Sequence, residues 1–554
     1  MILQALAKYY DDALSTSVAT GWQQRKATYI IDVDKNGNIL ASSTAAQINE
    51  LMPEAPKGKT GKSVKAAFLC DTGAYLFGIE EVNDKTKNGK EKYFAIRTLH
   101  LDILKNVTSE IATAIKAFFA LEEPKQPPNG VAKGTVCVIA VNGIKAYEND
   151  EIIKAWNAAQ STVASGTQIV DMVTGGKDAV ARLHGSIKGL GQDSPSLINI
   201  NKEAFASYGK TKDDPAAYIG EQTAFKYVTA LNSLIADTKH RSRVGDSSFI
   251  YWAENGQGEE ESIFSSIWDM KVDEDDSTKL SEIISAIKGG KPITNCNIES
   301  AFHVLCMSLQ SKRIVIRRYY SNTLGNVVKN IIDHYERLKI ADGDLSRLTP
   351  FHLLGNTTIK KGEKYSDPAP LLGGQLLNAI ITGTPYPMTL YNAILTRIRA
   401  GEDINKTKAS IVKAVLIRNY NEQEVTTVAL NTQISNTPYT LGRLFSVLEK
   451  LQKEASGGNL SSTIRDKYFA TACANPASVF PTVLKLSMHH AAKLDNAVFY
   501  EKLKTELLGK LDAETPFPKA LSLDDQGRFI LGYYHQTQDF YTKKENKTEE
   551  QTDV

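Results

Sequence analysis

The feature that most limits the fold of this chain is a change of pattern near residue 320. Beyond it, strand-like alternation disappears and apolar residues recur three or four positions apart in one segment after another. In the segment 439–455 this apolar face consists of Leu441, Leu444, Phe445, Leu448 and Leu451, and lysines and arginines fall on the other faces. This spacing is typical of amphipathic helices. Residues 326–541 are therefore predicted to form a helical bundle.

The first third of the chain mixes strand and helix patterns. ATYIIDV and NILAS flank DKNGN (34–38), whose central Asn-Gly is typical of a hairpin turn. AAFLCD and AYLFGIEEV flank Thr72-Gly73 and predict a second hairpin, and the apolar spacing within 94–121 predicts a helix. A proline-rich break follows at 122–130.

These patterns predict the α+β fold class, with antiparallel hairpins in a mixed α/β N-terminal region and an all-α C-terminal bundle. The later strand patterns include SSFIYWA (247–253) and KRIVIRRYY (312–320). The predicted parts are an α+β domain at 1–125, a central mixed α/β domain at 126–325, the bundle at 326–541, and a disordered tail at 542–554, which has almost no apolar residues.

The composition restricts the classes of function. The 554 residues carry a formal net charge of +2, so any binding of nucleic acid must come from local basic patches. The five cysteines form no C-x-x-C pair, and no metal or cofactor motif is present. Scattered cysteines without a secretory leader, and no long apolar run, predict a cytoplasmic protein that does not span a membrane.

The stretch GKTGKS (58–63) resembles half of a phosphate-binding loop. The full pattern requires a glycine five positions before Gly61, and Pro56 stands there, which removes a backbone N–H from the nest that would hold phosphate. We therefore do not expect a nucleotide-hydrolysing loop. Four lysines remain on this stretch, either as a solvated surface or as contacts to a nucleic-acid backbone: Lys57, Lys59, Lys62 and Lys65.

Other basic positions give weaker signals. The glycine-rich segment 184–210 is either a structural turn or a segment that holds nucleic-acid backbone through its amides and Lys188. The arginines near paired tyrosines suit nucleic acid, but such side chains also line the margin of a core, and basic residues of the bundle also form ordinary solvated faces. The remaining candidates are Lys239, Arg241, Arg243, Arg317, Arg318, Lys406, Lys408, Lys413 and Arg418.

Catalysis has little support in the sequence. The acidic run DEDDS (273–277) contains carboxylates of the kind that a two-metal nuclease uses, but it lies in a polar loop rather than on strand ends. We therefore expect a protein that is not an enzyme, with no catalytic residues. A metal-dependent nuclease that uses residues 273–276 is one alternative, and a purely structural scaffold is another.

Four ordered blocks carry a family resemblance. MILQALAKYYDDAL, ARLHGSIKGLG with AFASYGK, RVGDSSFIYWAE and QGRFILGYYHQ resemble the large subunit of the type I-C CRISPR surveillance complex, Cascade. The resemblance spans residues 1 to about 541. It implies a non-catalytic subunit that recognises the protospacer-adjacent motif (PAM) in duplex DNA and promotes R-loop formation, while the guide reads the target sequence.

The resemblance also implies partners. These are crRNA, target double-stranded DNA, the handle-binding, backbone and small subunits of Cascade, and a helicase-nuclease that is recruited after the R-loop forms. A small subunit of this family can arise by internal initiation, for which Met388 or a non-Met codon nearer 430 is a candidate start.

The resemblance gives the lysine-rich stretch a role. At FLCDTGAYLFG the family carries Asp-Asn, whereas this chain has Asp71-Thr72, and Thr lacks the second donor of an amide. Our hypothesis is that Lys57, Lys59, Lys62 and Lys65 hold phosphates while Thr72 lies near the groove.

Overall fold

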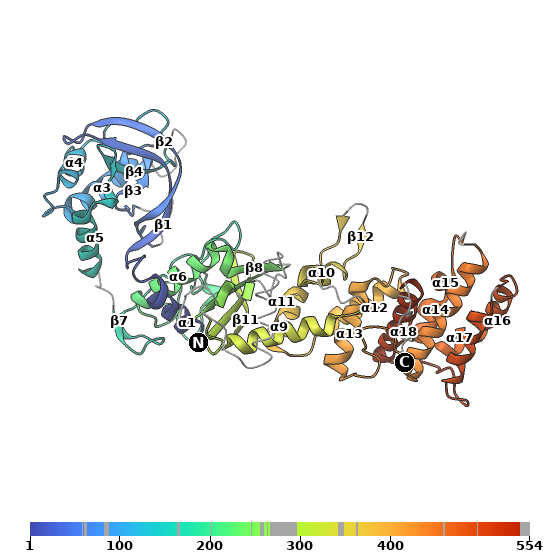
Figure 1. The fold of residues 1–554 in the computed structure, drawn as a ribbon. Helices are drawn as coiled ribbons and strands as arrows, with labels where there is room; N and C mark the ends of the chain where they lie inside the picture. Colours follow the sequence, from blue (N-terminus) through green and yellow to red (C-terminus); the bar gives the residue numbers. More distant parts are fainter. Residues whose placement is uncertain are drawn as a thin grey trace, which may run out of the picture. The chain divides into compact units, whose positions relative to one another are not determined.

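The computed structural model divides the chain into two compact units, each described by itself below (Figure 1). The first contains Met1–Thr238, Glu254–Gln257 and Leu309–Ile314, and the second contains Lys239–Ala253, Gly258–Ser308 and Val315–Val554. The structure describes residues 1–57, 59, 64–81, 88–162, 167–200, 202–244, 246–254, 260–262, 264–265, 296–341, 348–361, 364–457, 460–495 and 497–542.

A mixed sheet forms the core of the first unit. Its strand order is β2 (Ile39–Pro53), β1 (Trp22–Val33), β4 (Val136–Val141) and β3 (Cys70–Thr72), and β5 (Ile144–Lys145) pairs with β4. β1 and β2 are the predicted Asn-Gly hairpin, whose turn is closed by the Asp34 side chain, which accepts from the backbone N–H groups of Asn36 and Asn38 at 2.9 and 2.7 Å. That prediction is confirmed.

The second predicted hairpin is wrong. β3 pairs with β4, which lies more than sixty residues later in the chain, and the segment after Thr72 forms the short helix α2 (Gly73–Leu76). Because β4 also pairs in parallel with β1, residues 136–141 belong to the N-terminal sheet, and the predicted boundary at 125 does not separate two units. The predicted helix within 94–121 is two helices, α3 (Gly89–Ile103) and α4 (Glu110–Phe118), because Ser109 caps the start of the second.

Helices and small strands complete the first unit. They are α1 (Ile2–Tyr9), the π-helix η1 (Tyr10–Leu14), the 3-10 helices η2 (Ala146–Glu148) and η3 (Glu203–Phe205), α5 (Asp150–Thr162), the hairpin of β6 (Gln168–Val170) and β7 (Lys177–Ala179), and α6 (Glu221–Ala236). Within this unit α1 packs against α6, and the rings of Tyr10 and Phe225 meet edge to face, 5.6 Å apart.

A four-stranded sheet begins the second unit. Its order is β11 (Arg313–Thr323), β10 (Ala301–Gln310), β9 (Ser247–Ala253) and β8 (Arg241–Val244), after the 3-10 turn η4 (Thr238–His240). The strand prediction for 247–253 is confirmed, and every residue of β9 is buried. The prediction at 312–320 is also confirmed, since β11 covers nearly all of it.

After β11, the elements of the second unit in the described residues are helices and two short strands. The elements are α9 (Leu324–Leu338), α10 (Pro350–Gly355), β12 (Lys360–Lys361), β13 (Lys364–Tyr365), α11 (Leu372–Thr382), α12 (Met388–Arg399), α13 (Lys406–Tyr420), α14 (Thr437–Ala455), α15 (Ile464–Ala474), α16 (Pro476–Ala491), α17 (Val498–Gly509) and α18 (Leu523–Tyr541). The bundle and the α+β class are thus as predicted, and the candidate start Met388 is the first residue of α12.

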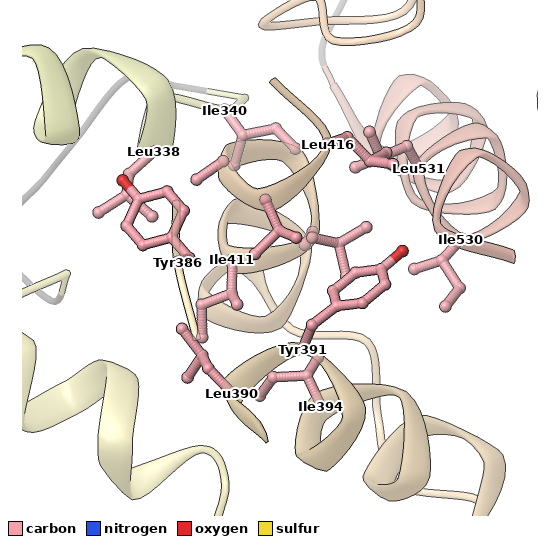
Figure 2. Packing of buried hydrophobic residues seen from close by; sticks show 14 of the residues in the cluster. Leu338, Ile340, Tyr386, Leu390, Tyr391, Ile394, Ile411, Leu416, Ile530 and Leu531 are labelled. Carbon is pink, nitrogen blue, oxygen red and sulfur yellow. The ribbon is translucent and has the colours of Figure 1, made fainter. Parts of the chain in front are cut away.

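One continuous apolar core joins these helices. Figure 2 shows Ile411 and Leu416 of α13 between Leu338 of α9 and Leu531 of α18. The predicted apolar face of α14 is buried throughout, but so is Arg443, which the pattern predicts to lie on an outer face. Its guanidinium donates to the Gln536 side chain at 3.1 Å, because α18 covers that side of α14.

Helices α14 and α18 approach each other closely through glycines. A Cβ added to Gly442 of α14 would lie 1.9 Å from the carbonyl oxygen of Phe529, and one added to Gly532 of α18 would lie 2.0 Å from that of Tyr439. Only glycine leaves room for backbone to meet backbone at such a crossing.

Among the described residues, no helix is both long and apolar enough to cross a membrane.

Candidate nucleic-acid interface

Asp71 is a buried carboxylate that ties together the two ends of the lysine-rich loop. Its Oδ2 lies 2.5 Å from Nζ of Lys59 and accepts from the backbone N–H of Ala67 at 2.7 Å, while its Oδ1 accepts from that of Thr72 at 2.7 Å. The exposed fractions of the Lys59 and Asp71 side chains are 19% and 1%, and the Lys59 ammonium lies 3.8 Å from the ring centre of Tyr75. Burial lowers the pKa of Lys59, against the opposing effect of Asp71. Lys59 is therefore an internal partner of Asp71. This corrects the prediction that Lys59 contacts phosphate.

This pair leads to a prediction about stability. Asp71→Asn should lower the free energy of unfolding by about 2–3 kcal/mol, because it leaves the Lys59 ammonium without its counter-charge in a largely buried place. Lys59→Met should also destabilise, and the double variant should lose clearly less than the sum of the two single changes. Urea unfolding of the full chain measures all three, with Lys65→Met as an exposed control that should change stability by less than about 0.5 kcal/mol. Strictly additive losses would contradict the pairing.

The other predicted residues of the loop lie nearer the surface. Lys65 is exposed, and its Nζ donates to the backbone carbonyl of Lys57 at 2.9 Å, while the Lys57 side chain is half-buried. Lys62 lies outside the described residues. Thr72 is half-buried, and as the N-cap residue of α2 its side chain makes no capping hydrogen bond. Lys57, Lys65 and Thr72 therefore stay in the candidate site.

Three separate segments bring cations together next to this loop. We call Arg25 and Lys26 of β1, Lys57 of the loop and Lys188 of the segment 184–196 the basic cluster. Desolvation lowers the pKa of Lys188, and the neighbouring Arg25 and Lys26 lower it further, while Glu54 opposes this shift. Burial raises the pKa of Glu54, while Lys57, Lys188 and Arg25 oppose this rise. Glu54 is one carboxylate among four cations, so a positive excess remains that would attract a phosphate chain.

The segment that carries Lys188 is fixed against α6. Asn232 of α6 accepts from the backbone N–H of Lys188 at 2.8 Å and donates to the carbonyl of Ser186 at 3.0 Å. Gly189 has a φ of +84°, which glycine adopts without strain. His184 is buried, and its Nδ1 lies 2.6 Å from the Tyr227 hydroxyl. The segment is therefore a well-held turn, and the turn aims the Lys188 side chain at solvent.

The predicted basic residues of the sheet strands belong to the second unit. Lys239 and Arg243 are exposed, Arg241 is half-buried, and both arginines lie on β8 at one edge of the sheet. Arg317 donates to the Ser308 hydroxyl at 3.0 Å, and Arg318 is exposed. These side chains therefore belong to a different unit from the basic cluster.

Lys408 and Lys413 are buried in internal contacts, which corrects their prediction as a strand-binding surface, and Arg418 is half-buried with an internal hydrogen bond. Lys408 is 5% exposed, with its Nζ 2.7 Å from the Glu402 carboxylate. Lys413 is 3% exposed and donates to the carbonyl of Lys339, and burial lowers its pKa to about 8. The Arg418 guanidinium donates to a backbone carbonyl of α11 at 2.9 Å. Lys406, at the start of α13, is half-buried.

Sequence reasoning missed Arg25 and Lys26. The only local signal is an adjacent basic pair inside the polar start of β1, WQQRKATY, and such a pair is ordinary on a solvated strand. Arg25 donates to the carbonyl of Pro53 at 3.1 Å, so the pairing of β1 with β2 holds it beside the loop.

Two predicted segments cannot be placed. The acidic run 273–277 of the nuclease alternative and the tail 543–554 lie outside the described residues.

Comparison with known proteins adds one finding to this geometry. The sequence model of a protein family described as "CRISPR-associated protein (Cas_Csd1)" matches residues 6–541. No curated protein matches the chain. The matched range includes every residue of the basic cluster and all the helices from α9 to α18.

Proposed function

This chain belongs to the Cas_Csd1 family of CRISPR-associated proteins, and from that premise we propose that it is the non-catalytic large subunit of a type I-C Cascade complex. In this proposal it recognises the PAM in duplex DNA and promotes unwinding and R-loop formation with the crRNA. It then supports recruitment of a helicase-nuclease, which does the cutting. Its other partners are the handle-binding, backbone and small subunits. The observation that supports this proposal most directly is the basic cluster, a local concentration of cations on a chain with a formal net charge of only +2.

The cluster suits the backbone of a duplex better than its bases. Lys57, Lys188 and Lys26 are point charges on flexible stems, and such contacts fix register without reading sequence. Lys65 extends the same basic surface. Reading of the motif then falls to a neighbour with hydrogen-bonding capacity, and Thr72 is the candidate because its hydroxyl is not used as a helix cap. A single hydroxyl in the minor groove reads mainly A·T against G·C.

Salt dependence tests this proposal. In the assembled complex, the double variant Lys57→Ala/Lys65→Ala should bind motif-containing duplex more weakly, and the slope of log K against log salt should become shallower by about 1.8, since each phosphate contact contributes about 0.9. The measurement is a fluorescence-anisotropy titration at several salt concentrations. The matched control is Lys35→Ala/Lys105→Ala, two exposed lysines of the same unit, which should leave the slope unchanged. An unchanged slope in the first variant would refute the assignment.

The non-catalytic role has its own measurement. The purified chain, incubated with single- and double-stranded DNA and Mg²⁺ or Mn²⁺, should leave both substrates intact. Cleavage that disappears when the whole run 273–276 is neutralised would establish the nuclease alternative instead.

A further inference from the structure

A strained and fully exposed tyrosine marks a second surface of the first unit. Tyr208 and Gly209 both have positive φ, 55° and 71°, and the N–H of Lys210 donates to the carbonyl of Ser207 across them at 3.1 Å. Asn-Gly is the favoured pair at the centre of such a turn, and a bulky residue there is strained. Tyr208 is also 98% exposed, so its ring buries nothing that would compensate for the strain. Uncompensated strain of this kind concentrates at binding sites.

Two further exposed rings flank this turn, each with a cation against its face. Phe205 is 39% exposed, and the guanidinium of Arg313 lies 3.2 Å from its ring centre. Tyr218 is 51% exposed, and Nζ of Lys210 lies 4.5 Å from its ring centre. We call Phe205, Tyr208 and Tyr218 the aromatic segment. Aromatic rings alternating with cations are typical of surfaces that stack bases and neutralise phosphates.

The aromatic segment continues from the segment that carries the basic cluster. Gly191, three residues after Lys188, packs so closely on Leu309 that an added Cβ would lie 2.7 Å from that side chain. Asp193 pairs with Lys312 at 3.7 Å, and the next residue, Arg313, covers Phe205. Contacts within the first unit therefore connect the segment that carries Lys188 with Phe205, and Tyr208 follows three residues later in the chain.

We propose that the aromatic segment is a stacking site for unpaired nucleotides of DNA that adjoin the duplex held at the basic cluster. The nature of the strand, DNA next to a bound duplex, rests on the function proposed above, whereas the aromatic surface itself does not. A protein partner fits the surface less well, because lysines are depleted from the cores of protein interfaces and here the Lys210 ammonium lies against the Tyr218 ring. Of the acidic side chains in this segment, Glu203 pairs with Lys212 at 3.9 Å and Asp214 accepts from the N–H of Thr211 at 2.7 Å, while Asp213 is exposed.

The test uses Tyr208→Asn in the full chain. Asparagine accepts positive φ but has no ring, so this variant should melt at the same temperature as the wild type or higher. It should bind single-stranded DNA of about 12 nucleotides roughly tenfold more weakly, because stacking on one ring contributes about a factor of ten. The probe is an oligonucleotide with one 2-aminopurine, whose fluorescence falls when the base stacks. Tyr208→Phe, which keeps the ring, should bind and quench like the wild type.

Controls separate this proposal from the duplex-binding one. Phe351→Ala removes a ring that is 74% exposed in the second unit and should leave binding unchanged. Lys57→Ala/Lys65→Ala should affect duplex DNA whether or not the aromatic segment binds a strand. The proposal is overturned if Tyr208→Asn binds single-stranded DNA like the wild type, or if Phe351→Ala weakens it equally. A preference for RNA of the same sequence would also overturn it, as would a Tyr208→Asn defect confined to assembly with protein subunits.

Discussion

Gly442→Ala should destabilise the helical bundle by about 3 kcal/mol or more, the upper end of the cost of overpacking a core. The new methyl carbon would lie 1.9 Å from the Phe529 carbonyl oxygen, whereas real Cβ atoms essentially never come within 3.0 Å of another heavy atom. The obstacle is backbone rather than a side chain, so no rotamer change relieves it, and α14 and α18 must separate. Gly532→Ala should have a comparable effect, because it meets the Tyr439 carbonyl from the opposite helix.

The matched control is Gly509→Ala at the end of α17. Nothing lies within 4 Å of an added Cβ there, and alanine is the better helix former, so stability should stay the same or rise by up to about 1 kcal/mol. Chemical unfolding followed by far-UV circular dichroism measures both changes. Equal midpoints for the Gly442 and Gly509 variants would show that the helices do not cross as closely as described.

Mild acid should destabilise the protein strongly, because its buried histidines resist protonation. Desolvation lowers the pKa of His100, His184, His303 and His535 to about 4, from an ordinary value of 6.5. As the pH falls below 6.5 the unfolded chain takes up these protons and the folded chain does not, so stability is lost progressively until about pH 4. At pH 5 each such histidine should cost about 2 kcal/mol relative to neutral pH.

One substitution isolates the contribution of a single histidine. His535→Gln should make the stability of the chain less dependent on pH between 5 and 6, by about 1.1 kcal/mol per pH unit, because most of one proton fewer is then taken up on unfolding. The exposed His489→Gln should leave the slope unchanged. Unfolding curves at several pH values test both, and an unchanged slope in the His535 variant would contradict a neutral, buried imidazole at the Tyr439 hydroxyl, 2.9 Å from its Nδ1.

The elements predicted well from sequence are those set by local pattern. The Asn-Gly hairpin and the helices α13 and α14 follow from turn chemistry and from apolar spacing within one short segment. The pairing of β3 with β4 could not be predicted in this way, because a three-residue strand carries no local sign of a partner so far along the chain. The full burial of Arg443 was missed for a similar reason, since α18, which covers it, is remote in sequence.

The candidate site also has a part that the sequence predicts and a part that only the fold brings together. The lysine-rich loop was evident as a run of charges, but the run could not show that Lys59 turns inward to Asp71 while Lys65 stays outside. Arg25, Lys26 and Lys188 come together only through the sheet and α6, so no window of sequence contains them. Lys408 and Lys413 have the composition of a solvated face but lie in the core, since charge alone does not reveal burial.

The turn between β10 and β11 has a practical consequence for anyone who wishes to dissect this protein. Residues 309–314 belong to the first unit although most of both strands belongs to the second. A fragment that stops at residue 238 would therefore lack Leu309 against Gly191 and Arg313 against Phe205. No single cleavage of the polypeptide can release the first unit whole, so an amino-terminal truncate should be less resistant to trypsin than the same residues within the intact chain.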